Sequence, residues 1–289
     1  MLKLRVWTTE YQKKSPCVLL LGGFDGLHAG HKKLVEKAKS FGLPIGIMSI
    51  VGGKEGEALF TLSEREKSFQ NAGAQFCFSM PFEKIKDMQA EEFLFALLQE
   101  FQVQAFVCGD DFRFGKGALG TPDFIKQATQ VCVETLPLVM EDGKKISSSQ
   151  IKAFVQQGEI QKANRLLGER FFLQGEVVQD RQIGRKLGFP TANIFYPKDK
   201  YPLKIGVYET RVCINGTQYN GITNYGSRPT FDNQTVLTET FLDGFSGDLY
   251  NQTLTVEFVR FLRDIQKFNG EESLKKQLEE DLRRVREND

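Results

Sequence analysis

The stretch GGFDGLHAGH, residues 22–31, separates two segments of different character. Before it, residues 17–21 form a short apolar run, which predicts a buried strand. After it, apolar side chains recur at helical spacing over residues 31–41. A glycine-rich turn between a strand and a helix presents backbone N–H groups and the positive end of the helix to a phosphate. The stretch therefore predicts an α/β fold with an anion-binding turn.

Both histidines of the chain lie in this turn, at His28 and His31. Their spacing places them on one face of the beginning helix. A single histidine is more often a packed surface or core residue than a catalytic one. Two histidines in one short turn, with none elsewhere in the chain, favour a catalytic role over simple packing.

Length and charge restrict the possible classes of protein. A chain of 289 residues suggests two domains, and a hydrophobic content of 40% is enough for a substantial core. With 38 Lys and Arg against 37 Asp and Glu, a nucleic-acid partner or an anionic membrane has no electrostatic support. No apolar run reaches membrane-spanning length, and residues 1–10 lack the apolar core of a signal peptide.

The five cysteines are odd in number, widely spaced and without the paired spacing of a metal site. They lie mostly inside apolar runs, so buried thiols in a reducing cytosol are the simplest interpretation. We therefore expect a cytoplasmic protein, a monomer or a weak oligomer, whose partners are small molecules rather than nucleic acid or membrane.

Strand-like and helix-like segments alternate through the first half of the chain. Thr61 and Glu64 have the spacing of a capping box, which predicts a helix that runs to about Ala72. The remaining expected elements are strands at 44–51, 75–79, 105–108 and 131–136, and helices at 90–101 and from 121 onward. This alternation predicts a parallel sheet covered on both faces. Ligands of such sheets bind beyond the carboxyl ends of the strands, where the histidine turn lies.

Two polar segments follow strands at the same predicted edge. GDDFRFGKG, residues 109–117, is either a polar loop or a part of the site. In KKISSSQIK, residues 144–152, Ser147 and Gln150 are a plausible capping pair for a helix that ends near Gln157. By itself this segment is simply a helix cap. Three hydroxyls and three lysines at a helix start would also hold a polyphosphate.

Together the three segments resemble the adenylyltransferase module of the bacterial bifunctional riboflavin kinase/FAD synthetase family. The turn is similar to the histidine signature of nucleotidyltransferases, and the combination of segments is more selective than the turn. The resemblance implies catalytic roles for His28 and His31. The residues that it assigns to ATP and its phosphates are Gly23, Phe24, Asp25, Asp111, Ser147, Ser148, Ser149 and Lys152.

The chain departs from the family pattern at three places in this half. Residues 49–53, SIVGG, replace a Thr-Phe-x-Pro-His-Pro type segment, which puts any ligand contact made there in doubt. Ser149 stands where threonine is usual, and Lys152 stands where arginine is usual. A lysine is a point charge rather than a bidentate fork, so we expect a looser phosphate geometry at Lys152.

The second half has a β-rich composition. Strands are expected at 171–178, 206–214, 217–224, 236–242 and 253–261, and Asn215-Gly216 is a strong signal for a two-residue hairpin. Many short strands with tight turns predict a small antiparallel barrel. Residues 271–286 predict an amphipathic helix, and residues 159–167 a short helix before the change of pattern. The expected domains are 1–157 and 171–289, joined by a linker at 158–170.

The strongest signal in this half is GRKLGFPTAN, residues 184–193. It is either a loop with a glycine turn ended by proline or, by its residue-for-residue similarity, the flavokinase signature. The resemblance assigns ATP and magnesium to Gly184, Lys186, Gly188, Pro190, Thr191 and Asn193, with Thr191 and Asn193 at the metal. Glu239 corresponds to the family's catalytic carboxylate, although an exposed strand carboxylate is usually only solvated. Tyr208, Arg228 and Phe231 lie in segments that match the family, and we expect them to contact the flavin.

The resemblance implies an α/β nucleotidyltransferase domain, Rossmann-like with a parallel sheet, followed by an antiparallel β-barrel flavokinase domain with a C-terminal helix. It implies two reactions: ATP-dependent phosphorylation of riboflavin to FMN, with Mg²⁺, and adenylylation of FMN to FAD with release of pyrophosphate. The main alternative is a single-activity nucleotidyltransferase with a flavin-binding C-terminal domain. A regulator with an inactive catalytic module, or a structural protein, would not need the phosphate-binding residues that are present.

Overall fold

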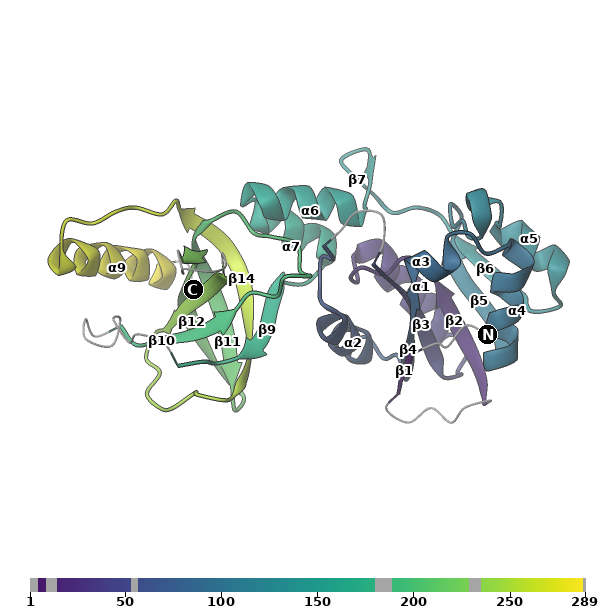
Figure 1. Ribbon diagram of the computed structural model, residues 1–289, viewed down its shortest axis with the longest axis horizontal. Coiled ribbons are helices and arrows are strands. Elements are labelled where there is room, and N and C mark those ends of the chain that lie inside the picture. Colours follow the sequence, from purple (N-terminus) through teal and green to yellow (C-terminus); the bar gives the residue numbers. More distant parts are fainter. Residues whose placement is uncertain (1–4, 9–14, 53–56, 180–188, 229–234, 288–289) are drawn as a thin grey trace. The chain divides into compact units, whose positions relative to one another are not determined.

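The computed structural model describes residues 5–8, 15–52, 57–179, 189–228 and 235–287. The chain forms two compact units (Figure 1). Unit 1 comprises Met1–Ser148 together with Asp199–Tyr201. Unit 2 comprises Ser149–Lys198 and Pro202–Asp289.

Unit 1 is built on a six-stranded sheet. Its strands, in spatial order, are β1 (Arg5–Thr8), β4 (Phe76–Pro81), β3 (Ile45–Val51), β2 (Pro16–Leu21), β5 (Gln102–Gly109) and β6 (Cys132–Leu136). All neighbouring pairs are parallel except that of β1 with β4. The predicted parallel sheet is confirmed, whereas the antiparallel edge strand β1 was not predicted.

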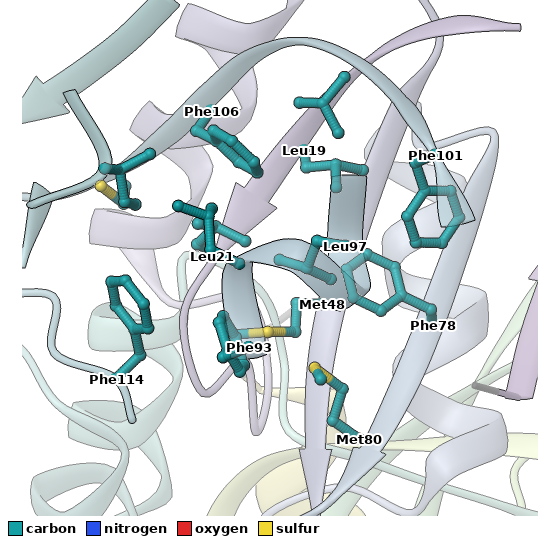
Figure 2. Close-up of a cluster of buried hydrophobic side chains, with 14 of the residues drawn as sticks. Leu19, Leu21, Met48, Phe78, Met80, Phe93, Leu97, Phe101, Phe106 and Phe114 are labelled. Carbon is teal, nitrogen blue, oxygen red and sulfur yellow. The ribbon is translucent and has the colours of Figure 1, made fainter. Parts of the chain in front are cut away.

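The central strand β2 explains why helices cover both faces of this sheet. Successive side chains of a strand point to opposite faces, so its continuous apolar run requires two hydrophobic layers. Cys17, Leu19 and Leu21 belong to one buried cluster, shown in Figure 2, and Val18 and Leu20 belong to the other. The first cluster includes apolar residues of α4 (Ala90–Glu100) and α5 (Pro122–Ala128). The second includes those of α1 (Ala29–Lys39) and α2 (Leu62–Asn71).

The starts of these helices follow from local sequence. The predicted capping box of α2 is present, with the side chains of Thr61 and Glu64 each accepting the other residue's backbone N–H. Thr121 caps α5 by accepting from the N–H of Phe124 at 3.0 Å. Helix α1 begins at Ala29, earlier than its apolar periodicity predicts, because the side chain of His28 caps it. Short elements that the patterns did not predict are α3 (Phe82–Ile85), η1 (Lys116–Ala118), β7 (Met140–Glu141) and β8 (Lys144–Lys145).

Unit 2 is an antiparallel sheet of six strands that is nearly closed into a barrel. Its spatial order is β10 (Thr191–Phe195), β13 (Thr235–Leu242), β12 (Thr217–Arg228), β11 (Gly206–Ile214), β14 (Thr253–Arg263) and β9 (Phe172–Glu176). The N–H of Val178 donates to the carbonyl of Asn193 at 2.8 Å, which links the segment after β9 to β10. The predicted hairpin joins β11 to β12, and Asn215 and Gly216 both have positive φ, as a type I′ turn requires.

Residues 158–170, expected to be a linker, contain the helix α7 (Ile160–Leu167), whose apolar residues are buried. The side chain of Asn164 donates to the carbonyl of Phe258 in β14 at 2.8 Å and accepts from the N–H of Phe171 at 2.7 Å. Helix α6 (Ser148–Gln157) belongs to unit 2 from Ser149 onward. The compact units thus divide the chain at the start of α6, and the boundaries of independently folding domains stay a prediction.

The C-terminal helix α9 (Glu271–Arg286) has the predicted bounds and packs on the barrel. Val285 is buried in a cluster with Val207 and Ile222. Asp281, fully buried, accepts three hydrogen bonds from the guanidinium of Arg263 in β14, at 2.8–3.1 Å. The buried ion pair fixes one side of α9 to the strand.

Two further expectations concern the burial of the cysteines and the presence of membrane-spanning segments. All five cysteines are free, and Cys17, Cys77 and Cys108 are buried. Cys132 and Cys213 are exposed, so the interpretation as buried thiols is wrong for these two, because each lies on the outward face of its strand. Among the described residues, no helix has the length and apolar character needed to cross a membrane.

Candidate active sites

The histidine turn connects β2 to α1 and holds its two imidazoles against each other. The ring centroids of His28 and His31 are 3.6 Å apart and the rings are stacked. His28 Nδ1 accepts from the backbone N–H of His31 at 3.3 Å, and His31 Nδ1 lies 2.7 Å from the carbonyl oxygen of Gly26. Since a carbonyl only accepts, Nδ1 of His31 carries a proton, and a neutral His28 carries its proton on Nε2. The turn therefore assigns a different tautomer to each ring.

Both histidines favour the neutral state. Burial lowers the pKa of His28 from 6.5 to about 4, and the positive charge of Lys145 adds to this shift. Burial also lowers the pKa of His31 well below 6.5, with a second contribution from its neighbour His28. The two rings therefore offer hydrogen-bonding nitrogens at neutral pH rather than two full positive charges.

Phe24 fixes the shape of the turn beneath the histidines. Its φ of 41° lies in the left-handed region, which is strained for an aromatic residue. Its buried ring packs on His31, with centroids 4.3 Å apart. A side chain at Gly22 would meet this ring at 2.8 Å, whereas Gly23 is exposed and has open space around it. The backbone of Gly23 is thus accessible to a ligand, while Phe24 acts as a packed support.

Asp111 and Lys145 form an ion pair next to this turn. Asp111 follows β5, and Lys145 is the last residue of the β7–β8 hairpin. The charge of Lys145 acts on both histidines, so it belongs to the same electrostatic environment. Lys145 was not assigned to the site from the sequence, although it lies within the segment KKISSSQIK whose three lysines suggested a polyphosphate site.

The other residues predicted for adenylylation divide between the two units. Asp25 accepts from the backbone N–H of Leu59 at 2.9 Å. Ser147 and Ser148 are in unit 1, and α6 begins at Ser148. Ser149 and Lys152 lie in α6 within unit 2, where Lys152 is buried. Their contacts with nucleotide stay a prediction.

Unit 2 contains a pocket of about 550 Å³ beside β10. Pro190, Thr191 and Asn193 line one part of it, and Gly247 and Asp248, which follow β13, line another. Three residues predicted to bind ATP and magnesium therefore face one cavity. Its polar and apolar walls suit a ligand with a charged end and a planar body.

Glu239 lies beside this pocket in a row of polar residues. In the strand register it is directly opposite Asn193 of β10 on one side and Asn224 of β12 on the other. Residues paired in this way share one face of the sheet and lie about 5 Å apart at Cβ. Among the described residues, Oδ1 of Asn193 and Oδ1 of Asn224 are buried without a hydrogen-bond partner. The prediction did not include Asn224, although Asn224 lies in β12, the same strand as the predicted Arg228.

The remaining predictions for this site are supported unevenly. Gly184, Lys186, Gly188 and Phe231 lie outside the described residues. Arg228 is the last residue of β12. Tyr208 is fully buried between Phe258 and Phe261, and its hydroxyl donates to the carbonyl of Lys204. A flavin contact of Tyr208 has no support from this packing and stays a prediction.

Comparisons with known proteins match both halves of the chain. A family model described as FAD synthetase matches residues 10–150, and one described as riboflavin kinase matches residues 167–288. The bifunctional riboflavin kinase/FMN adenylyltransferase of Bacillus subtilis is 33% identical over 294 residues, which cover 94% of this chain and 92% of the relative. The protein of the same description from Mycoplasma pneumoniae is 32% identical, with coverages of 92% and 95%.

A crystal structure from Streptococcus pneumoniae, described as a macrolide-efflux protein, has the same fold as this chain. Its TM-score is 0.84 at 28% identity, and the match covers 94% of both chains. The description of that protein does not extend to this chain, because the sequence relatives with an identity above 30% include bifunctional riboflavin kinase/FMN adenylyltransferases.

A parallel α/β unit with a histidine turn, followed by a six-stranded barrel with a polar pocket, defines a two-part transferase that uses nucleotides. The chain belongs to the bifunctional riboflavin kinase/FMN adenylyltransferase family. The matches cover both predicted domains, so the alternative of a single-activity nucleotidyltransferase is not needed.

Proposed function

We propose that the chain adenylylates FMN at the histidine turn of unit 1 and phosphorylates riboflavin beside the pocket of unit 2. Membership of the family supplies the two reactions and the substrates ATP, riboflavin and FMN. The observation that carries the division is that the histidine pair and the row containing Glu239 belong to different compact units. Each unit then has its own chemistry.

Phosphorylation requires removal of a proton from a neutral hydroxyl. The 5′-hydroxyl of riboflavin is not ionised at neutral pH, so a carboxylate that accepts its proton lowers the barrier. Glu239 is the proposed acceptor. In the sheet register it lies between Asn193 and Asn224. Thr191 and Asn193, which line the pocket, are proposed to direct the phosphates toward it.

The amide oxygen of Asn193 also fits Mg²⁺. It is a hard oxygen ligand, it is buried without a hydrogen-bond partner among the described residues, and Thr191 lines the same cavity. When bound, Mg²⁺ would neutralise charge on the ATP phosphates. Thr191 and Asn193 are the residues proposed to hold it.

Adenylylation needs no general base. The nucleophile is the phosphate of FMN, whose second pKa of about 6 leaves it mostly ionised at neutral pH. The residues of unit 1 then have to align two anions and stabilise charge at the α-phosphate of ATP. His28 donates through its Nε2–H, and the ammonium group of Lys145 and the exposed backbone of Gly23 supply further donors. Ser147, Ser148 and Asp111 are proposed to complete the nucleotide site within unit 1.

The division is tested by two substitutions in the full chain. His28→Ala should abolish conversion of FMN to FAD while riboflavin is still phosphorylated, so FMN accumulates. Glu239→Gln should stop formation of FMN while FAD is made normally from supplied FMN. Loss of a general base costs about 10²- to 10⁴-fold in rate. The measurement is flavin chromatography of each variant with Mg-ATP and either riboflavin or FMN.

Two results would contradict this division. If Glu239→Gln phosphorylates riboflavin at nearly the original rate, Glu239 is not the base. If either folded variant loses both activities, the two reactions do not have separate sites.

A further inference from the structure

The chain leaves unit 1 at Ser148 and returns to it for only three residues, Asp199–Tyr201, before continuing in unit 2. We call these three residues the strap. The strap lies between β10 and β11 in sequence, within the half that matches riboflavin kinase. It is therefore a part of the kinase sequence built into the adenylyltransferase fold.

Backbone hydrogen bonds hold the strap against Ala58. The N–H of Ala58 donates to the carbonyl of Asp199 at 2.9 Å, and the N–H of Tyr201 donates to the carbonyl of Ala58 at 2.6 Å. This pattern is an isolated parallel bridge between Ala58 and Lys200. The bonds fix the register of the strap, which places the Lys200 side chain at one defined position.

Lys200 forms a fully buried ion pair. Its ammonium group donates to Glu64 at 2.6 Å, and both side chains have no exposed surface. The ring of Phe60 lies 4.5 Å from the same ammonium group, in cation–π geometry. Burial lowers the pKa of Lys200, and the Glu64 carboxylate opposes this shift. Loss of either partner would leave an uncompensated charge in the interior, which is strongly destabilising. The ion pair therefore keeps the strap attached to unit 1.

The partners of Lys200 also support the histidine turn. Glu64 accepts from the N–H of Thr61 at 2.8 Å and thereby defines the start of α2. The ring of Phe60 closes on Gly26, where an added Cβ would lie 2.8 Å from it. The next residue back, Leu59, donates its N–H to Asp25 at 2.9 Å. Residues 58–61 are thus in contact with the strap on one side and with the turn on the other.

We propose that Lys200 is a positioning residue for adenylylation: through Glu64 and Phe60 it sets the conformation of residues 58–61, and through them that of the histidine turn. The proposal rests on the proposed division of the two reactions. Gly26 lies against the ring of Phe60, and its carbonyl oxygen accepts a hydrogen bond from the ring of His31. A displacement of Phe60 would therefore move Gly26 and, through this hydrogen bond, the imidazole of His31. Displacement of aligned groups by about 1 Å can cost about 100-fold in rate.

The test uses three variants of the full chain. Lys200→Met removes the ammonium group and keeps most of the side-chain volume. The double variant Lys200→Met/Glu64→Gln removes both charges, so no ionised carboxylate is left beside the missing cation. Lys204→Met is the matched control, since its ammonium group also lies over a phenylalanine ring, 4.1 Å from Phe261, and pairs with Asp264, but in unit 2.

For Lys200→Met we expect kcat/KM for FAD formation from FMN to fall about 10- to 100-fold, with riboflavin phosphorylation within about twofold of the original. The double variant should recover most of the lost FAD formation, and Lys204→Met should leave it unchanged. The two histidines give two Cε1–H resonances, which report on the turn without any assay of activity. Both resonances should shift in Lys200→Met and return toward their original positions in the double variant.

The proposal is overturned if folded Lys200→Met makes FAD at the original rate. It is also overturned if FAD formation falls only in proportion to the unfolded fraction of unit 1 while the histidine resonances of the folded fraction stay in place, because Lys200 is then merely a stabilising residue. If the original chain makes no FAD from FMN and Mg-ATP, the proposed function fails instead. The resonances of the three variants then still decide whether the strap sets the turn.

Discussion

The imidazole of His28 is both the cap of α1 and a candidate donor to a phosphate. Its Nδ1 is engaged by the backbone of His31, which directs the Nε2–H away from the helix. A protonated ring would lose this cap, because both nitrogens of an imidazolium are donors. The low pKa of His28 therefore maintains the structure of the turn as well as its hydrogen-bonding pattern.

We predict that His28 titrates near pH 4 in the folded chain and that the pKa of His31 lies well below 6.5. Burial and Lys145 lower the pKa of His28 to about 4 from its ordinary 6.5, so between these values the unfolded chain binds a proton that the folded chain does not. Stability is therefore constant above pH 6.5 and falls as the pH drops toward 4. The contribution of His28 between pH 7 and pH 4.5 is about 2 kcal/mol. NMR titration of the two Cε1–H resonances and unfolding at each pH measure these values.

Two variants serve as controls for this titration. His28→Asn should lose less stability on acidification than the original chain. Lys145→Gln should raise the pKa of His28, because it removes a positive charge that opposes protonation. A folded-state pKa near 6.5 for His28 would contradict the burial of its ring.

At the residue scale, the sequence was most informative where signals are local. The histidine pair, the capping box at Thr61 and the hairpin at Asn215 each depend on neighbours in the chain, and the structure confirms their geometry. Lys200 carries no local signal, because its partner Glu64 lies 136 residues away and a lysine in a polar stretch is ordinarily solvated. Such contacts depend on topology and could not be predicted.

Among the elements, α9 shows how one buried ion pair fixes a helix whose hydrophobic contacts are few. Asp281 is fully buried, and Arg263 and Gln277 both donate to it. The apolar part of the contact consists mainly of Val285 and partly buried leucines. The position of α9 on the barrel is thus determined as much by charge as by hydrophobic burial.

We predict that Asp281→Asn destabilises unit 2 by about 3 kcal/mol, because it removes the fully buried carboxylate that pairs with the partly buried Arg263. Glu280→Gln is the matched control on the same helix, since Glu280 pairs with Arg283 and Arg284 at the surface, and it should cause no measurable change. Urea unfolding followed by circular dichroism compares the two variants. Equal midpoints would show that the Arg263 pair does not hold α9.

Elements and contacts that depend on long-range pairing were harder to predict than those with a local signal. The strand β10 begins within the motif GRKLGFPTAN, whose glycines and proline indicate a loop, and its pairing with β13 overrides that local preference. The short helix expected at 159–167 is present as α7, but the change of pattern did not indicate that its apolar face packs against β14. Both contacts join segments that are far apart in the chain, so they cannot be read from a single sequence.

At the scale of the whole molecule, the two units depend on the strap to different extents. Unit 2 loses little if residues 199–201 are displaced from unit 1, because they connect two of its strands in any case. Unit 1 without them loses the bonds to Ala58 and the cation beside Glu64. The riboflavin kinase half is therefore the more self-sufficient of the two.

We predict that a fragment of residues 149–289, which keeps α6 and α7, converts riboflavin to FMN unaided. A fragment of residues 1–157 should instead unfold at a temperature on the order of 10 °C below unit 1 in the full chain. The physical reason is the loss of Lys200 from a buried pair. Calorimetry and flavin chromatography of both fragments measure the two effects. A synthetic peptide of residues 196–203 should raise the melting temperature of the fragment of residues 1–157, and the same peptide with methionine in place of the lysine should not.

The strap also bears on how such a chain can be rearranged by recombination. The chain passes between the units at three points, after Ser148, Lys198 and Tyr201, so no single crossover separates a complete unit 1 from a complete unit 2. On one polypeptide the strap docks at the high effective concentration set by its tethers, of the order of millimolar for short flexible connections. If the two halves were encoded by separate genes, the strap would have to bind unit 1 in a bimolecular reaction, without this effective concentration. Exchange of either half between relatives should therefore succeed best when Glu64 and Lys200 are inherited together.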